Sequence, residues 1–175
     1  MKKLLITLLP FYFLAINACS KDDKPENPVD ALPPITQTGE NTFACLVDGK
    51  PFFSSSDRRA FYTFADGAYT LSISGSRYDD MGLRSIHLTG LDIVGGVTQG
   101  AHSLKTRTSG TYSAEYLIGG GIDLDVGTTD ENPGLLTITR FDLDEFIVSG
   151  TFEFTVEDDD GNIYKITNGR FDLKF

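Results

Sequence analysis

Cysteine and histidine are the residue types in this sequence that could form a nucleophilic site. Cys45 could act as a nucleophile with His87 or His102 as its base, because such partners are often distant in sequence and close in space. However, Cys45 alternates with Phe43 and Val47, which places it on the apolar face of a strand. An unpaired cysteine there behaves as a small hydrophobic residue. We therefore predict that Cys45 belongs to the core and that the chain is not an enzyme.

The two histidines do not form a recognisable metal site. His87 alternates with the apolar residues of its segment and shares a polar face with Ser85 and Thr89, toward solvent. His102 follows Gly100 and Ala101 at the expected start of a strand. Zinc sites combine four histidine, cysteine or carboxylate ligands at short spacings, and no such group is present. We expect no zinc and no other cofactor.

The segment Asp158-Asp159-Asp160-Gly161-Asn162 resembles the start of a calcium loop. An EF-hand loop requires a bidentate acid at its twelfth position, which here is Gly169. Aspartate, glycine and asparagine also suit a solvated hairpin turn, and we favour that interpretation. A weak calcium site at Asp158 and Asp160 is the alternative. The acidic residues that could share it are Asp142, Asp144 and Glu145.

Other kinds of site receive little support. With 25 acidic residues, carboxylate pairs arise by chance, and none lies in a glycosidase motif. The sequence contains no glycine-rich phosphate loop and no G-x-S-x-G elbow, so a hydrolase is the least favoured function. Glycan binding would need exposed aromatic side chains. Tryptophan is absent, and Tyr78, beside Asp79 and Asp80, is the best exposed candidate.

The N-terminus has the three parts of a secretory signal peptide. Lys2 and Lys3 precede an apolar stretch, 4–16, that is too short to span a ~30 Å hydrocarbon core. The stretch ends at Ile16-Asn17-Ala18-Cys19, which resembles the lipobox of bacterial lipoproteins. That resemblance implies cleavage between Ala18 and Cys19 and lipidation of Cys19. Two or more acyl chains, palmitate among them, would then hold the protein stably on a membrane.

The charge of the processed chain excludes some partners. Removal of residues 1–18 leaves 13 basic and 25 acidic side chains, a net charge of −12. Nucleic-acid binding requires basic patches that displace counterions from phosphates, so we expect no nucleic-acid partner. Peripheral binding to anionic lipid is disfavoured for the same reason. With Cys19 lipidated, Cys45 has no disulfide partner, and the domain must rely on its core.

The remaining sequence divides into a linker and one domain. Residues 19–41 comprise the lipidated cysteine and a proline-rich acidic linker, and an ordered domain is expected over 42–175. From Thr42 apolar residues alternate with polar ones, and turn signals separate the runs. Among these signals, Asp48-Gly49 and Asp66-Gly67 each predict a hairpin turn. The pattern predicts an all-β antiparallel domain of about nine to eleven strands, either a β-sandwich or a barrel-like closure. A change of parity at Asn168-Gly169 predicts a bulge in one bent strand rather than a second tight turn.

Segments of the domain resemble a family of uncharacterised surface lipoproteins from Bacteroidetes-type bacteria, a domain of unknown function. The similar segments are 41–52, 100–106, 134–142 and 149–175. Lys21, Asp22 and Asp23 resemble the acidic signal that sends lipoproteins to the cell surface in those bacteria. The resemblance implies an outer-membrane lipoprotein facing outward, and it brings no activity.

We therefore expect a lipid-anchored, non-enzymatic binding module with a membrane anchor and an unknown protein or glycan partner. The alternative is a lipocalin-like carrier of a small apolar ligand, whose barrel would hold that ligand in its interior.

Overall fold

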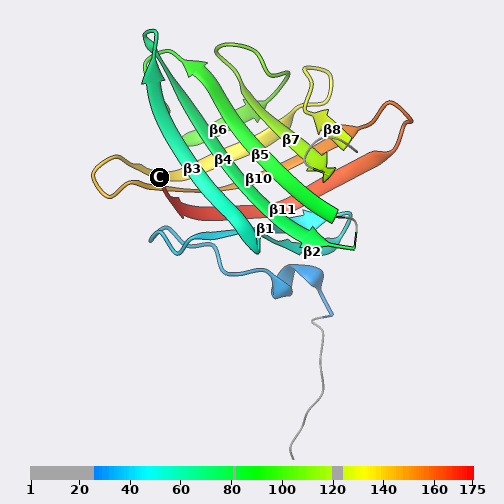
Figure 1. The fold of residues 1–175 in the computed structure, drawn as a ribbon. Coiled ribbons are helices and arrows are strands. Elements are labelled where there is room, and N and C mark those ends of the chain that lie inside the picture. Colours follow the sequence, from blue (N-terminus) through cyan, green and yellow to red (C-terminus); the bar gives the residue numbers. More distant parts are fainter. Residues whose placement is uncertain (1–25, 81, 120–123) are drawn as a thin grey trace, which may run out of the picture.

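The computed structural model describes residues 26–80, 82–119 and 124–175. These residues form eleven strands and one short 3-10 helix, and all the strands belong to one strongly curled sheet (Figure 1). The all-β prediction is confirmed, and of its two forms the barrel-like one describes the sheet. The elements are η1 Pro28–Ala31, β1 Thr42–Val47, β2 Lys50–Phe53, β3 Ser56–Ala65, β4 Ala68–Asp79, β5 Gly82–Ile93, β6 Gly100–Leu104, β7 Tyr112–Ile118, β8 Leu124–Gly127, β9 Gly134–Asp142, β10 Ile147–Glu157 and β11 Ile163–Lys174.

The strand order explains the curl. Along the sheet the strands follow one another as β2-β1-β11-β10-β9-β6-β7-β5-β4-β3, with β8 paired to β7. The pairs are antiparallel apart from one parallel bridge between Leu104 of β6 and Tyr112 of β7. The first and last strands of this order, β2 and β3, are neighbours in the chain. Ser54 and Ser55 connect them, and their amides bond Phe43 O of β1 and Ser76 O of β4. Hydrogen bonding thus continues around this corner and brings the two ends of the sheet together.

Two tight turns follow directly from the sequence. Asp48 and Gly49 join β1 to β2 with φ values of 49° and 74°. Asp66 and Gly67 join β3 to β4 with φ values of 52° and 85°. Two consecutive residues at positive φ form the turn whose twist matches that of antiparallel strands, and Asp-Gly adopts it readily. Both predicted hairpins are confirmed.

The bulge in β11 is also confirmed. The register of β10 against β11 shifts between Phe152 and Phe154, where residues 167–168 oppose Glu153 alone. Asn168 adopts a φ of 53°, which asparagine tolerates better than most residues. Beyond the bulge, β11 continues as one strand to Lys174.

The inward side of the curled sheet is filled by side chains. The Phe43 and Phe152 rings lie 5.2 Å apart, and the Phe152 and Phe171 rings 6.3 Å apart. A β carbon on Gly169 would lie 2.6 Å from Phe152 ring atoms, so glycine is required where this ring meets β11. The largest side chains that are under 2% exposed are Phe52, Leu71, Ile73, Ile86, Leu88, Leu104, Tyr116, Leu136, Ile138, Ile166, Phe171 and Leu173.

Packing begins earlier in the chain than the Thr42 expected from the sequence. Leu32 is buried against Ala44 and Leu46. Residues 32–41, here called the strap, run across β11, where the carboxylate of Asp172 accepts hydrogen bonds from them. The C-terminal half of the predicted linker is therefore part of the domain, because a buried aspartate in β11 holds it.

Candidate functional site

The proposed nucleophile lies in the core. Cys45 is fully buried and belongs to the same cluster as Phe43 and Val47, as the alternation predicts. Burial raises the pKa of its thiol well above the ordinary range, and the positive charges of Arg84 and Arg77 oppose this only in part. Thiol chemistry requires the thiolate, so Cys45 is unsuited to it at neutral pH.

Neither histidine is placed to activate Cys45. On the outer face of β5, the Nδ1 atom of His87 lies 3.9 Å from an Oε2 atom of Glu115. The His102 ring stacks on Tyr112 with 4.2 Å between ring centres, and its Nε2 atom lies 2.8 Å from the carbonyl oxygen of Thr98. The contacts of both histidines are therefore with residues other than Cys45.

The acidic residues considered for calcium hold turns. Asp158 accepts hydrogen bonds from the amides of Asp160 and Asn162, from the Asn162 side chain and from the Tyr164 hydroxyl. The bonds from Asn162, first among these, lower the pKa of Asp158 although desolvation opposes them. This is the hairpin-turn role that the sequence favours.

Asp142 and Glu145 belong to a different turn, between β9 and β10. Both bond the Arg140 guanidinium, each at 2.7 Å, and Asp142 also accepts from the amides of Asp144 and Glu145. The hydrogen bond from Arg140 is the main cause that lowers the pKa of Asp142. In the described part of the chain, no three histidine, cysteine, aspartate or glutamate side chains converge as metal ligands would.

The residues expected to carry the lipid anchor and its signals, Ala18, Cys19, Lys21, Asp22 and Asp23, lie outside the described residues. Among the residues that the structure does describe, none forms a helix long and apolar enough to cross a bilayer.

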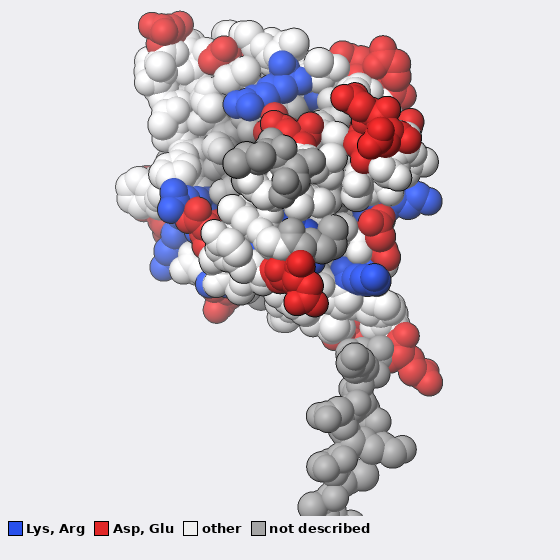
Figure 2. All heavy atoms as spheres, turned by 45° about the vertical axis from the view of Figure 1, so that its right-hand side comes forward, with Lys and Arg blue, Asp and Glu red and all other residues white. Residues whose placement is uncertain are grey.

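The chain has 25 acidic and 15 basic side chains. On the face shown in Figure 2 the acidic side chains gather in several separate clusters, with lysine and arginine side chains between them. Tyr78, the exposed tyrosine expected from the sequence, is 70% exposed. It borders a serine-rich depression on the outer face of β4 and β5, which His87 also lines.

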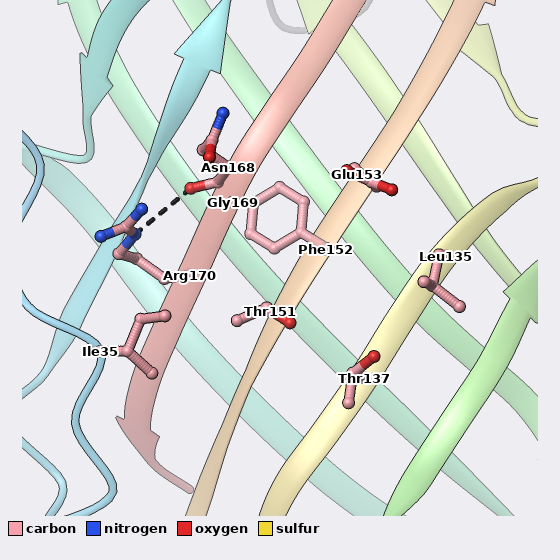
Figure 3. Close-up of a pocket in the computed structure, with 9 residues that line it drawn as sticks. All are labelled: Ile35, Leu135, Thr137, Thr151, Phe152, Glu153, Asn168, Gly169 and Arg170. Atoms are coloured by element: carbon pink, nitrogen blue, oxygen red, sulfur yellow. Dashed lines mark hydrogen bonds between the residues drawn. The ribbon is translucent and has the colours of Figure 1, made fainter. Parts of the chain in front are cut away.

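The outer face of β9, β10 and β11 carries a hollow of about 280 Å³, here called the outer hollow (Figure 3). Ile35 of the strap and Leu135 of β9 stand at its opposite sides, 56% and 42% exposed. A second hollow of about 270 Å³ adjoins it and shares Leu135 and Glu153. The residues that line the outer hollow are Ile35, Leu135, Thr137, Thr151, Phe152, Glu153, Asn168, Gly169 and Arg170.

The bulge of β11 helps to build the outer hollow. It adds an extra residue to β11 and turns Asn168 to the outer side, where its side chain borders the hollow. Arg170 next to it is held in place, because it donates from Nε to the carbonyl of Asn168 and from a terminal nitrogen to the carbonyl of Pro33 in the strap. Arg170 thus links β11 to the strap by hydrogen bonds at one edge of the outer hollow.

Several polar groups at the outer hollow have no partner inside the protein. Among the described residues, the side chains of Thr137, Thr151, Glu153 and Asn168 make no hydrogen bond. They supply two hydroxyls, a carboxylate and an amide. A ligand could bond them without displacing any contact that the fold requires.

Three features of the molecule were missed from the sequence: the strap, the outer hollow, and the two arginines over Phe52. The strap and the outer hollow depend on contacts across more than 130 residues, such as Arg170 with Pro33, and alternation within a strand carries no signal for these. The positions of Arg77 and Arg84 could have been noticed in the sequence. Each arginine interrupts the alternating apolar residues of its strand, at a position where an apolar side chain is expected. Both guanidinium groups lie over the Phe52 ring, with their central carbons 5.5 Å and 5.7 Å from the ring centre.

Comparison of the chain with protein-family models, with curated proteins and with solved structures found no match.

Proposed function

We propose that this chain is a lipid-anchored outer-membrane lipoprotein, displayed at the cell surface, whose domain binds a small hydroxyl-rich ligand such as a sugar unit in the outer hollow. The anchor rests on the lipobox pattern at Cys19 and the surface address on Lys21-Asp22-Asp23. The binding role rests on one observation: four unpartnered polar side chains border a hollow between two exposed aliphatic residues.

The hydrogen-bonding groups of the outer hollow match those of a sugar. Each sugar hydroxyl both donates and accepts, as do the hydroxyls of Thr137 and Thr151 and the amide of Asn168. Glu153 adds an acceptor, and Arg170 adds guanidinium donors. Ile35 and Leu135 offer apolar surface for the C–H groups of a sugar ring. One acid and one base balance the charge, which favours an uncharged ligand.

The position of the strap suits this role. It forms one wall of the outer hollow through Ile35 and, by the proposed anchor, leads toward the membrane. From Cys19 to Glu26, where the described chain begins, the chain can span at most roughly 25 Å, at ~3.6 Å per residue. This limit would keep Glu26, the start of the described chain, near the surface to which the protein is attached.

A carrier for an apolar ligand is the alternative. Such a carrier holds its ligand inside the barrel, and here the aromatic rings of Phe43, Phe152 and Phe171 already occupy the interior. This packing favours binding at the outer surface. Since Cys45 and the histidines are engaged elsewhere, we propose no catalytic role.

Sugar binding can be tested on the processed chain with Cys19 replaced by serine. We expect saturation-transfer NMR to detect one or more members of a panel of methyl hexosides. Two variants remove hydrogen-bonding groups from the outer hollow without disturbing the local structure. Thr151→Val keeps the shape of the side chain, and Asn168→Gly allows residue 168 to keep its positive φ. Each should weaken binding about tenfold, the effect of one lost hydrogen bond.

Thr63→Val provides the matched control, because Thr63 is an exposed threonine of β3 and does not line the hollow. Its affinity should equal that of the parent chain. The proposal is wrong if no sugar binds, or if Thr151→Val and Thr63→Val bind equally well.

A further inference from the structure

Six aromatic rings form a continuous row at one end of the curled sheet, here called the aromatic row. Neighbouring rings in it lie between 4.7 Å and 6.1 Å apart, within the usual range for aromatic pairs. The row joins the β3–β4 hairpin to the β9–β10 hairpin and the C-terminus, which is labelled at the left in Figure 1. Its members, in order, are Phe64, Tyr69, Tyr62, Phe141, Phe175 and Phe146.

Both ends of the aromatic row are open to solvent. Phe64 is 63% exposed and Phe146 57%, whereas the four rings between them are half-buried. Two aliphatic side chains on neighbouring connections extend the exposed apolar surface, Val94 after β5 and Leu143 in the β9–β10 turn, 83% and 55% exposed. Apolar side chains from β3, from the connection after β5 and from the β9–β10 turn thus face solvent at the same end, as at protein interaction sites.

The backbone at Phe146 adds an independent observation. Its φ is 56°, in the left-handed region that bulky side chains rarely adopt and that glycine would occupy without strain. Strained conformations of this kind gather at functional sites, where the surrounding structure enforces them. Here the Phe146 carbonyl is fixed by the amide of Phe175 at 2.9 Å. The chain therefore keeps an exposed aromatic ring where folding alone would favour glycine.

Most of the charges around the aromatic row are negative, although Lys174 precedes Phe175 of the row. Asp66 occupies the β3–β4 turn, Asp92 precedes the connection after β5, and Asp144 and Glu145 lie in the β9–β10 turn. None of these three connections, all of them described, contains lysine or arginine. Arg140, at the base of the β9–β10 turn, is paired with Asp142 and Glu145. The negative charges of Asp66, Asp92 and Asp144, which form no ion pair among the described residues, therefore border the apolar surface.

The exposed apolar side chains and the acidic residues around them together indicate which kind of partner could bind this surface. In a symmetric dimer through this surface, the acidic borders of the two copies would face each other and repel. An anionic membrane surface would be repelled by the same residues. A protein whose apolar patch is bordered by lysine and arginine would be attracted to both parts of this surface. Its apolar patch would pack on the exposed rings, and its basic residues would pair with the aspartates around them.

We infer that the aromatic row is a docking surface for a second, different protein, one that presents an apolar patch with a basic border. Phe64, Phe146, Leu143 and Val94 supply the apolar contact, and Asp66 and Asp144 fix the orientation of the partner. This surface is separate from the outer hollow, so the inference does not depend on the sugar-binding proposal.

Photo-crosslinking in intact cells tests the inference. The probe is p-benzoylphenylalanine, placed at position 146 in the full-length chain, with the same probe at position 61 as control. Phe61 is matched because it is a phenylalanine of 54% exposure on β3 and is not part of the aromatic row. We expect one discrete adduct from position 146 and none from position 61. Mass spectrometry should place the attachment beside lysine or arginine residues of a different protein.

Two further variants distinguish a specific contact with the partner protein from non-specific adhesion of the apolar surface. Phe64→Ser should reduce the adduct from position 146 several-fold while thermal stability is largely kept. Asp66→Asn combined with Asp144→Lys should do the same by removing and reversing charge, since asparagine tolerates the positive φ of residue 66.

Four outcomes would overturn the inference. The first is an adduct between two copies of this chain, which would indicate self-association. The second is binding of the unlipidated chain to phosphatidylethanolamine/phosphatidylglycerol vesicles that Phe64→Ser abolishes, which would indicate a membrane. The third is equal adducts from positions 146 and 61, and the fourth is no adduct from position 146 in cells that display the protein.

Discussion

The Ser149 hydroxyl donates a hydrogen bond of 2.7 Å to the carboxylate of Asp172 in the buried seam between β10 and β11. The same carboxylate accepts from the hydroxyl of Thr36, and its remaining partners are backbone amides of the strap. Those amides belong to Thr38, Gly39 and Glu40. One aspartate, 1% exposed, therefore joins the strap to the last two strands.

The stability of the fold should depend on pH through Asp172. Burial alone would raise the pKa of this carboxyl, but the hydrogen bonds from Ser149, Glu40, Thr36 and Gly39 outweigh it and lower the pKa to about 2. The stabilisation that the ionised Asp172 carboxylate gives the folded state is therefore fully present above the ordinary pKa near 4. It is lost as the pH falls toward 2, where the carboxylate becomes protonated. It should amount to roughly 2 to 3 kcal/mol. Urea unfolding between pH 7 and pH 2 measures it.

Asp172→Asn is the direct comparison for that measurement. The amide would place N–H donors against strap donors, so we expect lower stability at pH 7 and a flatter dependence on pH below 4. Asp159→Asn, in the exposed β10–β11 turn, should follow the parent curve. An unchanged curve for Asp172→Asn would show that the aspartate does not hold the strap.

The thiol of Cys45 should be inert in the folded protein. Burial raises its pKa and also keeps reagents away. We expect Ellman's reagent to titrate no thiol in the processed Cys19→Ser chain under native conditions and one thiol in denaturant. Cys45→Ala should cost about 1 kcal/mol of stability and leave ligand binding intact. Rapid native labelling would mean that this strand opens.

Gly169→Ala should destabilise the domain by about 1 to 3 kcal/mol, as overpacking typically does. The added carbon would lie 2.6 Å from atoms of the Phe152 ring. Phe152→Leu has its own cost, but it should relieve this contact and make the double variant more stable than the two costs predict. A double-mutant cycle from urea unfolding provides the comparison. Simple additivity of the two changes would contradict the packing described.

The proposed anchor predicts a change in where the protein partitions. Cys19→Ala should leave the chain uncleaved or unlipidated, because no thiol remains at position 19 to carry lipid. We expect it to move from the detergent phase to the aqueous phase in Triton X-114 separation, whereas Cys45→Ala should stay with detergent. Continued detergent partitioning of Cys19→Ala would contradict lipidation at this residue.

The parts of the fold that could be predicted are those determined by local sequence. Alternation located the apolar faces that carry Cys45 and Phe152, and Asp-Gly pairs located two hairpins. The change of parity at Asn168 located the bulge, because an extra residue in a strand must reverse which side chains face inward.

The parts that could not be predicted depend on which strands meet. Alternation is the same in a sandwich and in a barrel, so the order in which the strands pair and the corner at Ser54 and Ser55 are needed to show how the sheet curls. Likewise, nothing near Ile35 in the sequence indicates Leu135 as its counterpart across a hollow. The aromatic row combines residues of three strands, β3, β4 and β9, with Phe146 from the β9–β10 turn and Phe175 after β11. Each of these residues looks like an ordinary core position by itself.

The hydrogen bonds of Asp172 also determine how the domain would respond to mechanical load. With the proposed anchor at Cys19, the chain would be pulled through its N-terminus whenever flow or a bound partner drew the domain away from the cell. The force would reach the bonds between the strap and Asp172 before it reaches any strand pair of the sheet. The strap would then detach first and lengthen the tether, and it would carry Ile35 away from the outer hollow while the sheet stays folded. Tension on the anchor and occupancy of that hollow would thus be linked.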